Sequence, residues 1–353
     1  MPPDDLSADE PAGFSLEDAQ VRAALQAADD PGATPAERAE MLMEIATGLQ
    51  TRPRSPAQLS DALDLYQRAQ ALLGPGHELL AARIRAREGT AHQALPDGGA
   101  AALHAARACF EQARPVLAAQ GLPEEVAELD LNLGLVTQAL AQERQARVPD
   151  AIAHYHRALK VFTRERWPRE FAIVHNNLAV AYLSLPAVDE RSRMAEALAV
   201  QSYEEVLKVV TLVDHPAEYA MTQNNLGNAL QYAPSGHRVA NLLRALQAYD
   251  EALKVRDPRT MPVPYANTIA NQANALLNLP DSPEHPEQGN AGNRARARAL
   301  YVQARQIFER HGQAGAAESV AQALADIDAE GAGLADVADL ADFAASRVPG
   351  APA

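Results

Sequence analysis

The sequence predicts an all-α protein built as a solenoid of antiparallel helix pairs, and three observations favour this class. Apolar residues recur at helical spacing along most of the 353 residues. Runs that alternate between apolar and polar residues, as strands do, are nearly absent. One short pattern returns six times, with 44 to 52 residues between successive copies. A repeat of this kind indicates stacked helical units that share a core.

The repeated pattern is an alanine, an aromatic residue four positions later, a small apolar residue three later and an aliphatic residue three later. These spacings put all four side chains on one face of a helix. Each copy therefore predicts the buried face of the second helix of a pair. The six aromatic members are Tyr66, Phe110, Tyr155, Tyr203, Tyr249 and Tyr301.

A second pattern precedes these copies and predicts the first helix of each pair. It reads HNNLAVAY at 175–182, QNNLGNAL at 223–230 and ANQANALL at 270–277, with weaker forms at 42–49, 87–95 and 131–136. The two patterns together resemble the tetratricopeptide repeat, whose first helix typically reads Asn-Leu-Gly-x-Ala-Tyr. Residues 225–229 match that helix almost position for position, and the resemblance covers about residues 40–310.

The resemblance implies a right-handed superhelical solenoid that binds proteins or peptides in its concave groove. The present repeats are longer than the usual 34 residues, at about 45 residues each. Extended repeats of this kind resemble those of large bacterial multi-domain signalling proteins. The extra residues lie in the turns, for example at 186–195 and 212–217, so the curvature of the groove does not follow from the family.

Helix-breaking residues predict the boundaries. We expect a disordered N-terminus at 1–14, a capping helix within 15–35, six helix pairs over 36–312, capping helices over 313–347 and a disordered tail at 348–353. The capping region reads as two helices, 314–329 and 333–346. The Pro- and Gly-rich segment 279–293 is not helical throughout, and it is either a tolerated insertion or a functional flap.

Composition narrows the class of partner. The net charge is −15, which argues against nucleic-acid binding because phosphates require a basic face. The acids gather at both ends, where they keep terminal repeats soluble or form a docking site. No apolar run is long enough to cross a membrane, and 1–14 lacks a signal-peptide pattern, so we expect a cytoplasmic protein. The excess of Arg over Lys is typical of a GC-rich bacterial genome.

The sequence offers no catalytic or metal-binding motif. It contains no phosphate-binding loop, nucleophile elbow, HExxH or CxxC motif. His154 and His156 point in different directions on a helix, and Cys109 is expected to be a buried thiol without a disulfide partner. We therefore predict a protein that is not an enzyme and has no cofactor and no metal site.

The asparagines of the first helices fall into two groups. Asn132, Asn177, Asn225 and Asn271 share one repeat position, which favours a structural role between helices. A second set lies on a neighbouring stripe, at spacings of three and four, and offers amide donors and acceptors suited to a peptide backbone. This predicted groove, which is otherwise merely a hydrated surface, consists of Asn176, Met221, Asn224, Asn228, Gln231, Asn267, Asn274 and Asn278.

These observations predict an adaptor or scaffold that binds a protein or an extended peptide in its concave groove. The alternative is a regulator whose curvature changes when a small ligand or signal peptide binds. A clustered effector pocket and two crystal forms of different pitch would favour the regulator, whereas a shared operon with a protease or enzyme would favour the adaptor.

Overall fold

The computed structural model describes residues 22, 25–26, 28, 32–186, 190–233 and 237–345. The chain divides into two compact units, Met1–Ser184 (unit 1) and Leu185–Ala353 (unit 2). Each unit is described by itself. The predicted N-terminus 1–14, most of the capping helix and the tail 348–353 lie outside the described residues.

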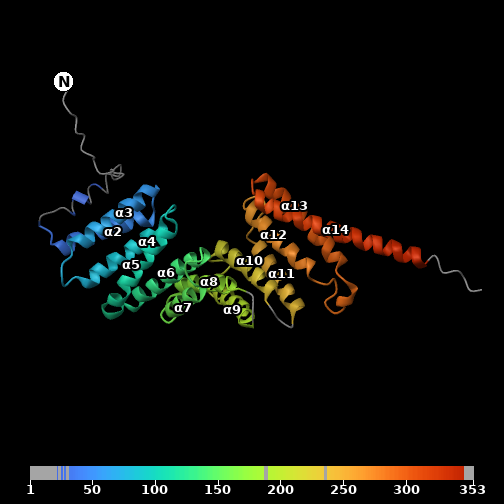
Figure 1. Ribbon diagram of the computed structural model, residues 1–353, viewed down its shortest axis with the longest axis horizontal. Helices are drawn as coiled ribbons and strands as arrows, with labels where there is room; N and C mark the ends of the chain where they lie inside the picture. The colour runs from blue at the N-terminus through green and yellow to red at the C-terminus, as the bar shows by residue number, and fades with distance from the viewer. Residues whose placement is uncertain are drawn as a thin grey trace, which may run out of the picture. The chain divides into compact units, whose positions relative to one another are not determined.

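The described residues contain thirteen α-helices and no strand, which confirms the all-α class (Figure 1). Unit 1 holds α2 (Pro35–Thr51), α3 (Pro56–Leu72), α4 (Glu78–Ala94), α5 (Gly99–Gln120), α6 (Pro123–Gln142), α7 (Val148–Ala158) and α8 (Pro168–Leu183). Unit 2 holds α9 (Glu190–Leu207), α10 (Pro216–Tyr232), α11 (Arg238–Leu253), α12 (Pro262–Leu277), the 3₁₀ helix η1 (Pro286–Gln288), α13 (Ala291–Arg310) and α14 (Ala314–Ala345). None of these helices is both long and apolar enough to cross a membrane.

Successive helices pack as pairs within each unit. In unit 1, α2 packs on α3, α4 on α5 and α6 on α7; in unit 2, α10 packs on α11 and α12 on α13. Each pair also contacts the next one along the chain, as α3 contacts α4 and α11 contacts α12. Each unit is thus a stack of helix pairs, as in an α-solenoid.

Proline sets the start of most first helices. Pro35, Pro123, Pro168, Pro216 and Pro262 each open a helix. Proline suits this position for two reasons. A backbone N–H in the first turn has no acceptor inside the helix, so proline loses no hydrogen bond there, and its φ is already helical. At α2 the cap is completed by Thr34, whose backbone N–H donates to Glu37 Oε2 at 2.8 Å.

The repeated aromatic residues form the core, as predicted. Tyr66, Phe110, Tyr155 and Tyr249 have no exposed surface, and Tyr203 and Tyr301 are at most 6% exposed. Glycine in the first helix makes room for the ring in three pairs, α4–α5, α6–α7 and α10–α11. A Cβ on Gly134 would lie 2.4 Å from Cε1 of Tyr155, and one on Gly227 would lie 2.5 Å from Cε1 of Tyr249.

A buried carboxylate joins three helices of unit 1. Asp130 on α6 is 3% exposed. It accepts hydrogen bonds from Arg114 on α5, at 3.0 and 3.2 Å, and from Arg157 on α7, at 2.9 Å. Burial alone would raise the pKa of Asp130, but hydrogen bonds from His154, Arg114 and Arg157 outweigh it and hold the pKa well below its usual value. Asp130 therefore links neighbouring helix pairs through ion pairs of its buried carboxylate.

The segment between α12 and α13 contains only a short 3₁₀ helix, in line with its Pro and Gly content. Its base is fixed by Asp281, whose carboxylate accepts the backbone N–H groups of Gly292 at 2.8 Å and Asn293 at 2.7 Å. Asn293 is 6% exposed and donates to Leu279 O and Pro280 O, both at 3.1 Å. A carboxylate at the start of a helix is favoured by the free N–H groups there.

The C-terminal region differs from the prediction of two closing helices. A single helix, α14, continues from Ala314 to Ala345. The predicted break contains Gly331 and Gly333 but no proline. Glycine inside a helix costs only about 1 kcal/mol, so it does not end the helix here.

Candidate functional site

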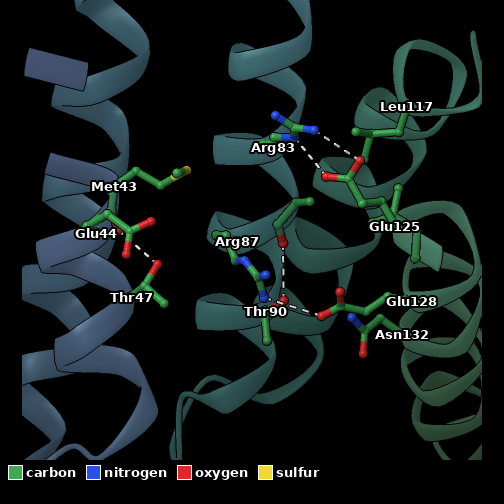
Figure 2. A pocket seen from close by; sticks show the side chains of 12 residues that line it. Met43, Glu44, Thr47, Arg83, Arg87, Thr90, Leu117, Glu125, Glu128 and Asn132 are labelled. Atoms are coloured by element: carbon green, nitrogen blue, oxygen red, sulfur yellow. Dashed lines mark hydrogen bonds and ion pairs between the residues drawn. The ribbon is translucent and has the colours of Figure 1, made fainter. Parts of the chain in front are cut away.

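A hollow of about 270 Å³ lies on the first helices of unit 1. Figure 2 shows side chains from α2, α4 and α6 pointing into this space. We call it the α2–α4–α6 hollow, and its polar lining is chiefly Glu44, Arg83, Arg87, Glu125, Glu128 and Asn132. Three successive first helices therefore build one continuous face.

The lining residues occupy matching positions in their repeats. Ala46, Gly89 and Gly134 stand at the repeat position of the small residue that faces the aromatic ring. Two positions before each of them stand Glu44, Arg87 and Asn132, and one position after the first two stand Thr47 and Thr90. Spacings of three and four residues make a stripe along each helix, so the helical repeat itself directs these side chains into one hollow.

Two ion pairs cross the hollow from α4 to α6. Arg83 Nε lies 2.7 Å from Glu125 Oε1, and Arg87 Nη1 lies 3.3 Å from Glu128 Oε1 (Figure 2). The hydrogen bond from Arg83 is the main reason that the pKa of Glu125 lies below its usual value. Such part-exposed pairs contribute only about 0–1 kcal/mol to the stability of the fold. Their main effect is to fix the orientation of the four charged side chains.

Glu44 differs from the other charged groups of the hollow. It is exposed on α2 and makes no hydrogen bond or ion pair to any residue that the structure describes. Three carboxylates and two guanidinium groups give the polar lining a net charge of −1. The carboxylate of Glu44 is thus available to a cationic group from outside.

The predicted groove residues of unit 2 lie on α10, on α12 and, for Asn278, at the residue that follows α12. The helices α10 and α12 contact each other directly. Met221 is 43% exposed, and Asn267 and Asn278 are exposed as well. The eighth predicted residue, Asn176, lies in unit 1 on α8 and is half-buried, and its Oδ1 is buried without a hydrogen-bond partner among the described residues. The predicted set is therefore divided between the two units.

The assignment of Asn224 to an open surface is wrong. Its side chain is only 8% exposed, and its Oδ1 accepts a hydrogen bond of 3.2 Å from Asn271 Nδ2. Asn225, predicted to be the structural neighbour, is the more exposed of the two. One position along a helix turns a side chain by about 100°, and the packing of α12 on α10 decides which of the two faces inward.

Two further groove residues are held by Tyr249 of the second helix. The Tyr249 hydroxyl donates to Asn228 Oδ1 at 2.7 Å and accepts from Gln231 Nε2. Gln231 also donates to the backbone oxygen of Asn271 at 3.2 Å. These amides connect α10 to α11 and α12, so they support the face and are only partly free for a partner.

The end of α12 shows the same internal pairing. Asn278 Nδ2 donates to Asn274 O at 3.0 Å, and its Oδ1 accepts from Arg238 Nη2 at 2.7 Å.

The asparagine position that four repeats share has no single role. Asn132 lines the α2–α4–α6 hollow, while Asn177 donates to Ile173 O within its own helix at 2.8 Å.

The charged lining of the hollow was not singled out from the sequence. Glu44, Arg83, Arg87, Glu125 and Glu128 resemble the solvated face of any surface helix. The available signal was their repeat position, because Glu44 and Arg87 stand where Asn132 stands in the third pair.

No protein-family model and no curated protein matches the sequence. Among solved structures, the chain is similar to the TPR2AB-domain:pHSP90 complex of yeast Sti1, with 14% identity over 82% of this chain and 98% of that chain. The TM-score of 0.28 is low. The fold assignment therefore depends on the helices and contacts described above.

Proposed function

We propose that this chain is a protein-binding scaffold that holds an extended peptide across the α2–α4–α6 hollow. The observation that carries the proposal is the hollow itself, which three successive first helices line with outward-facing polar side chains. Its volume of about 270 Å³ suits one or two side chains of a partner and not a folded domain. An extended segment reaches across three helices without needing a deep cavity.

The chemistry of the hollow favours a peptide with a lysine or arginine. No cation among the residues that the structure describes pairs with Glu44, and the lining carries a net charge of −1. A cationic side chain that reaches Glu44 gains a charge-assisted hydrogen bond. Asn132 offers one acceptor and two donor hydrogens, which suit the C=O and N–H groups of a peptide backbone.

Exposed side chains on the neighbouring first helices α10 and α12, which we call the α10–α12 face, extend the proposal to unit 2. Met221 and Asn267 are exposed at matching repeat positions on neighbouring first helices. We assign them an apolar and a polar contact with a bound segment. Asn224, Asn228, Gln231, Asn274 and Asn278 act mainly by keeping this face in shape, because they are hydrogen-bonded within the chain.

The test is selection of peptides from a random displayed library on the immobilised full chain. We expect the selected peptides to share a lysine or arginine, and Glu44→Gln to weaken their binding about 10- to 100-fold, since a hydrogen bond to a charged group contributes about 1.5–3 kcal/mol. Asn132→Ala should weaken binding about 2- to 10-fold.

The matched control is Asp64→Asn, which removes an exposed carboxylate from α3, the second helix of the same pair. Its affinity should equal that of the wild type. Unchanged affinity in both Glu44→Gln and Asn132→Ala would mean that the α2–α4–α6 hollow is not the binding site.

A further inference from the structure

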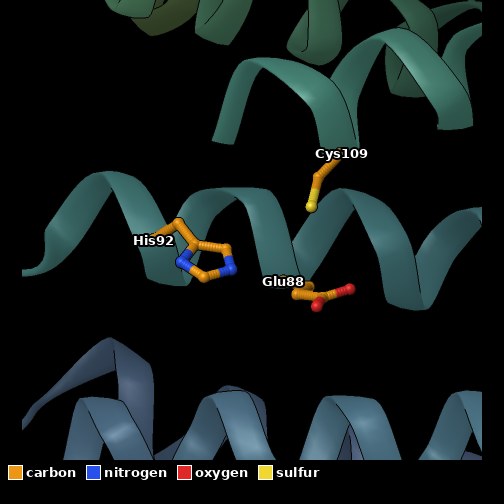
Figure 3. A group of neighbouring side chains, drawn as sticks. All are labelled: Glu88, His92 and Cys109. Atoms are coloured by element: carbon orange, nitrogen blue, oxygen red, sulfur yellow. The ribbon is translucent and has the colours of Figure 1, made fainter. Parts of the chain in front are cut away.

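Three side chains with metal-binding atoms meet between α4 and α5. Glu88 and His92 lie one turn apart on α4, and Cys109 lies on α5. A carboxylate oxygen, an imidazole nitrogen and the thiol sulfur all lie within 4.8 Å of one another. Figure 3 shows the Cys109 thiol pointing from its helix toward α4, which carries Glu88 and His92.

Gly89 explains why the two helices come so close at this point. A Cβ at Gly89 would lie 3.1 Å from Cβ of Cys109 and 2.7 Å from Cε1 of Phe110. Any larger residue would push α5 away and carry the thiol out of reach. The glycine that makes room for the core aromatic ring therefore also brings Cys109 to Glu88 and His92.

The cluster is largely buried, which is unusual for a carboxylate such as that of Glu88. Glu88 is 4% exposed, Cys109 is 7% exposed and His92 is half-buried. Burying a charged carboxylate is costly unless it is paired. The ion pair is with Arg85, whose Nη1 lies 3.0 Å from Glu88 Oε2, and the Arg85 side chain is 35% exposed at the protein surface.

Burial shifts the pKa values of two members of the cluster. Burial lowers the pKa of His92. Burial, together with the charge of Glu88, raises the pKa of the Cys109 thiol to about 11. The guanidinium of Arg85 balances the negative charge of Glu88.

We propose that Glu88, His92 and Cys109 form a binding site for Zn²⁺, with water as the fourth ligand on the side of Arg85. Sulfur, nitrogen and carboxylate oxygen are the donors that zinc prefers. Bonds of about 2.0–2.3 Å hold tetrahedral ligand atoms about 3.3–3.7 Å apart, so the three atoms need to move inward by only about 1 Å. Thiolate and carboxylate together neutralise the ion, which suits a buried position.

Zinc binding at this site would displace the thiol proton and release Arg85 from Glu88. Zn²⁺ forms bonds to sulfur, nitrogen and oxygen; the thiol proton leaves for solvent, and Arg85 leaves Glu88 for water. Zinc and Arg85 therefore compete for the carboxylate.

Cobalt(II) titration of the full chain, first stripped with a chelator, tests the proposal. We expect one Co²⁺ per chain, with a thiolate-to-cobalt charge-transfer band that one equivalent of Zn²⁺ removes. Cys109→Ala should abolish the band, and Glu88→Gln and His92→Ala should each weaken Co²⁺ binding more than about tenfold, at least the effect of losing an outer partner of a metal ligand.

Two controls separate a metal site from a structural cluster. His104→Ala removes an exposed histidine of α5 outside the cluster and should leave the titration unchanged. Arg85→Gln should tighten Co²⁺ binding, because it removes the competing cation, whereas a purely structural ion pair would give no such gain. Absence of a charge-transfer band at one equivalent in the wild type, or its persistence in Cys109→Ala, would overturn the proposal.

Discussion

The hydroxyl of Tyr155 donates a hydrogen bond of 2.8 Å to Oε1 of Gln138, and this bond joins the second helix of the pair to the first. The same bond joins Tyr66 to Gln50, also at 2.8 Å. In the α4–α5 pair the aromatic residue is Phe110, which has no hydroxyl. The glutamine at the matching position is Gln93, and its Oε1 is buried without a hydrogen-bond partner among the described residues.

Phe110→Tyr should therefore stabilise the protein. The new hydroxyl would supply a donor to Gln93 Oε1, and a satisfied buried hydrogen bond contributes about 0.5–1.5 kcal/mol. The urea midpoint of unfolding should rise accordingly. Tyr155→Phe is the reverse control and should lower stability by about 1–3 kcal/mol, because it leaves Gln138 without its donor. A loss of stability in Phe110→Tyr would show that the ring of Phe110 is not placed as Tyr155 is.

Gly134→Ala should lower the free energy of unfolding by about 1–3 kcal/mol, the usual cost of overpacking. The added Cβ would lie 2.4 Å from the Tyr155 ring, so the helices must separate. Gly48→Ala is the matched control on α2, where no atom lies within 4 Å of the new Cβ. It should raise stability by about 0.5–1 kcal/mol because alanine favours helix. Equal effects at the two glycines would contradict this close contact. Urea unfolding of both variants makes the comparison.

Asn224→Ala should destabilise unit 2 more than Asn225→Ala. It leaves Nδ2 of the half-buried Asn271 without its acceptor, at a cost of about 1–3 kcal/mol. Asn225 is more exposed, and its replacement should change stability by less than about 0.5 kcal/mol. Thermal unfolding of both variants at one pH distinguishes this order from the opposite one that the repeat position alone suggests.

Asp130→Asn should lower stability at pH 7 by about 1–3 kcal/mol, the usual contribution of hydrogen bonds to a charged group. The pKa of Asp130 is depressed in the folded protein. Its stabilisation is therefore present above the unfolded pKa of about 4 and is lost as pH falls toward the folded pKa. The difference between wild type and Asp130→Asn should shrink when urea unfolding is repeated at about pH 3.

The control for Asp130 is Asp328→Asn, which removes a carboxylate that is 55% exposed and paired with Arg298. An exposed pair of this kind contributes about 0–1 kcal/mol, so stability should change little at either pH. A difference at Asp130 that stays constant with pH would mean that its ion pairs are not the source of the effect.

The helical class and the core were predictable because the aromatic pattern repeats at helical spacing. Tyr66, Phe110, Tyr155 and Tyr249 are fully buried, as that pattern requires. The pattern extends slightly past some helices, however: Val161 and Val255 lie beyond the ends of α7 and α11. Side-chain spacing sets the buried face, while the turn that follows sets the end of the helix.

The binding face was harder to predict because adjacent positions on a helix differ by about 100°. Whether Asn224 or Asn225 faces inward depends on α12, which lies more than 30 residues further along the chain. The proposed zinc ligands were missed for a related reason. Glu88 and His92 have the spacing of helical neighbours, but the third ligand is on the partner helix, and only the contact at Gly89 brings it close.

The Asp281 cap makes the segment between α12 and α13 a suitable place for an inserted reporter. Its base is held by bonds to Gly292 and Asn293, whereas Glu284 and Glu287 are exposed near its tip. A fluorescent label or a short affinity tag placed at 284–288 therefore leaves the helix start intact. Partner binding could be measured with a chain labelled in this way, because the label would alter neither the α2–α4–α6 hollow nor the exposed residues of α10 and α12.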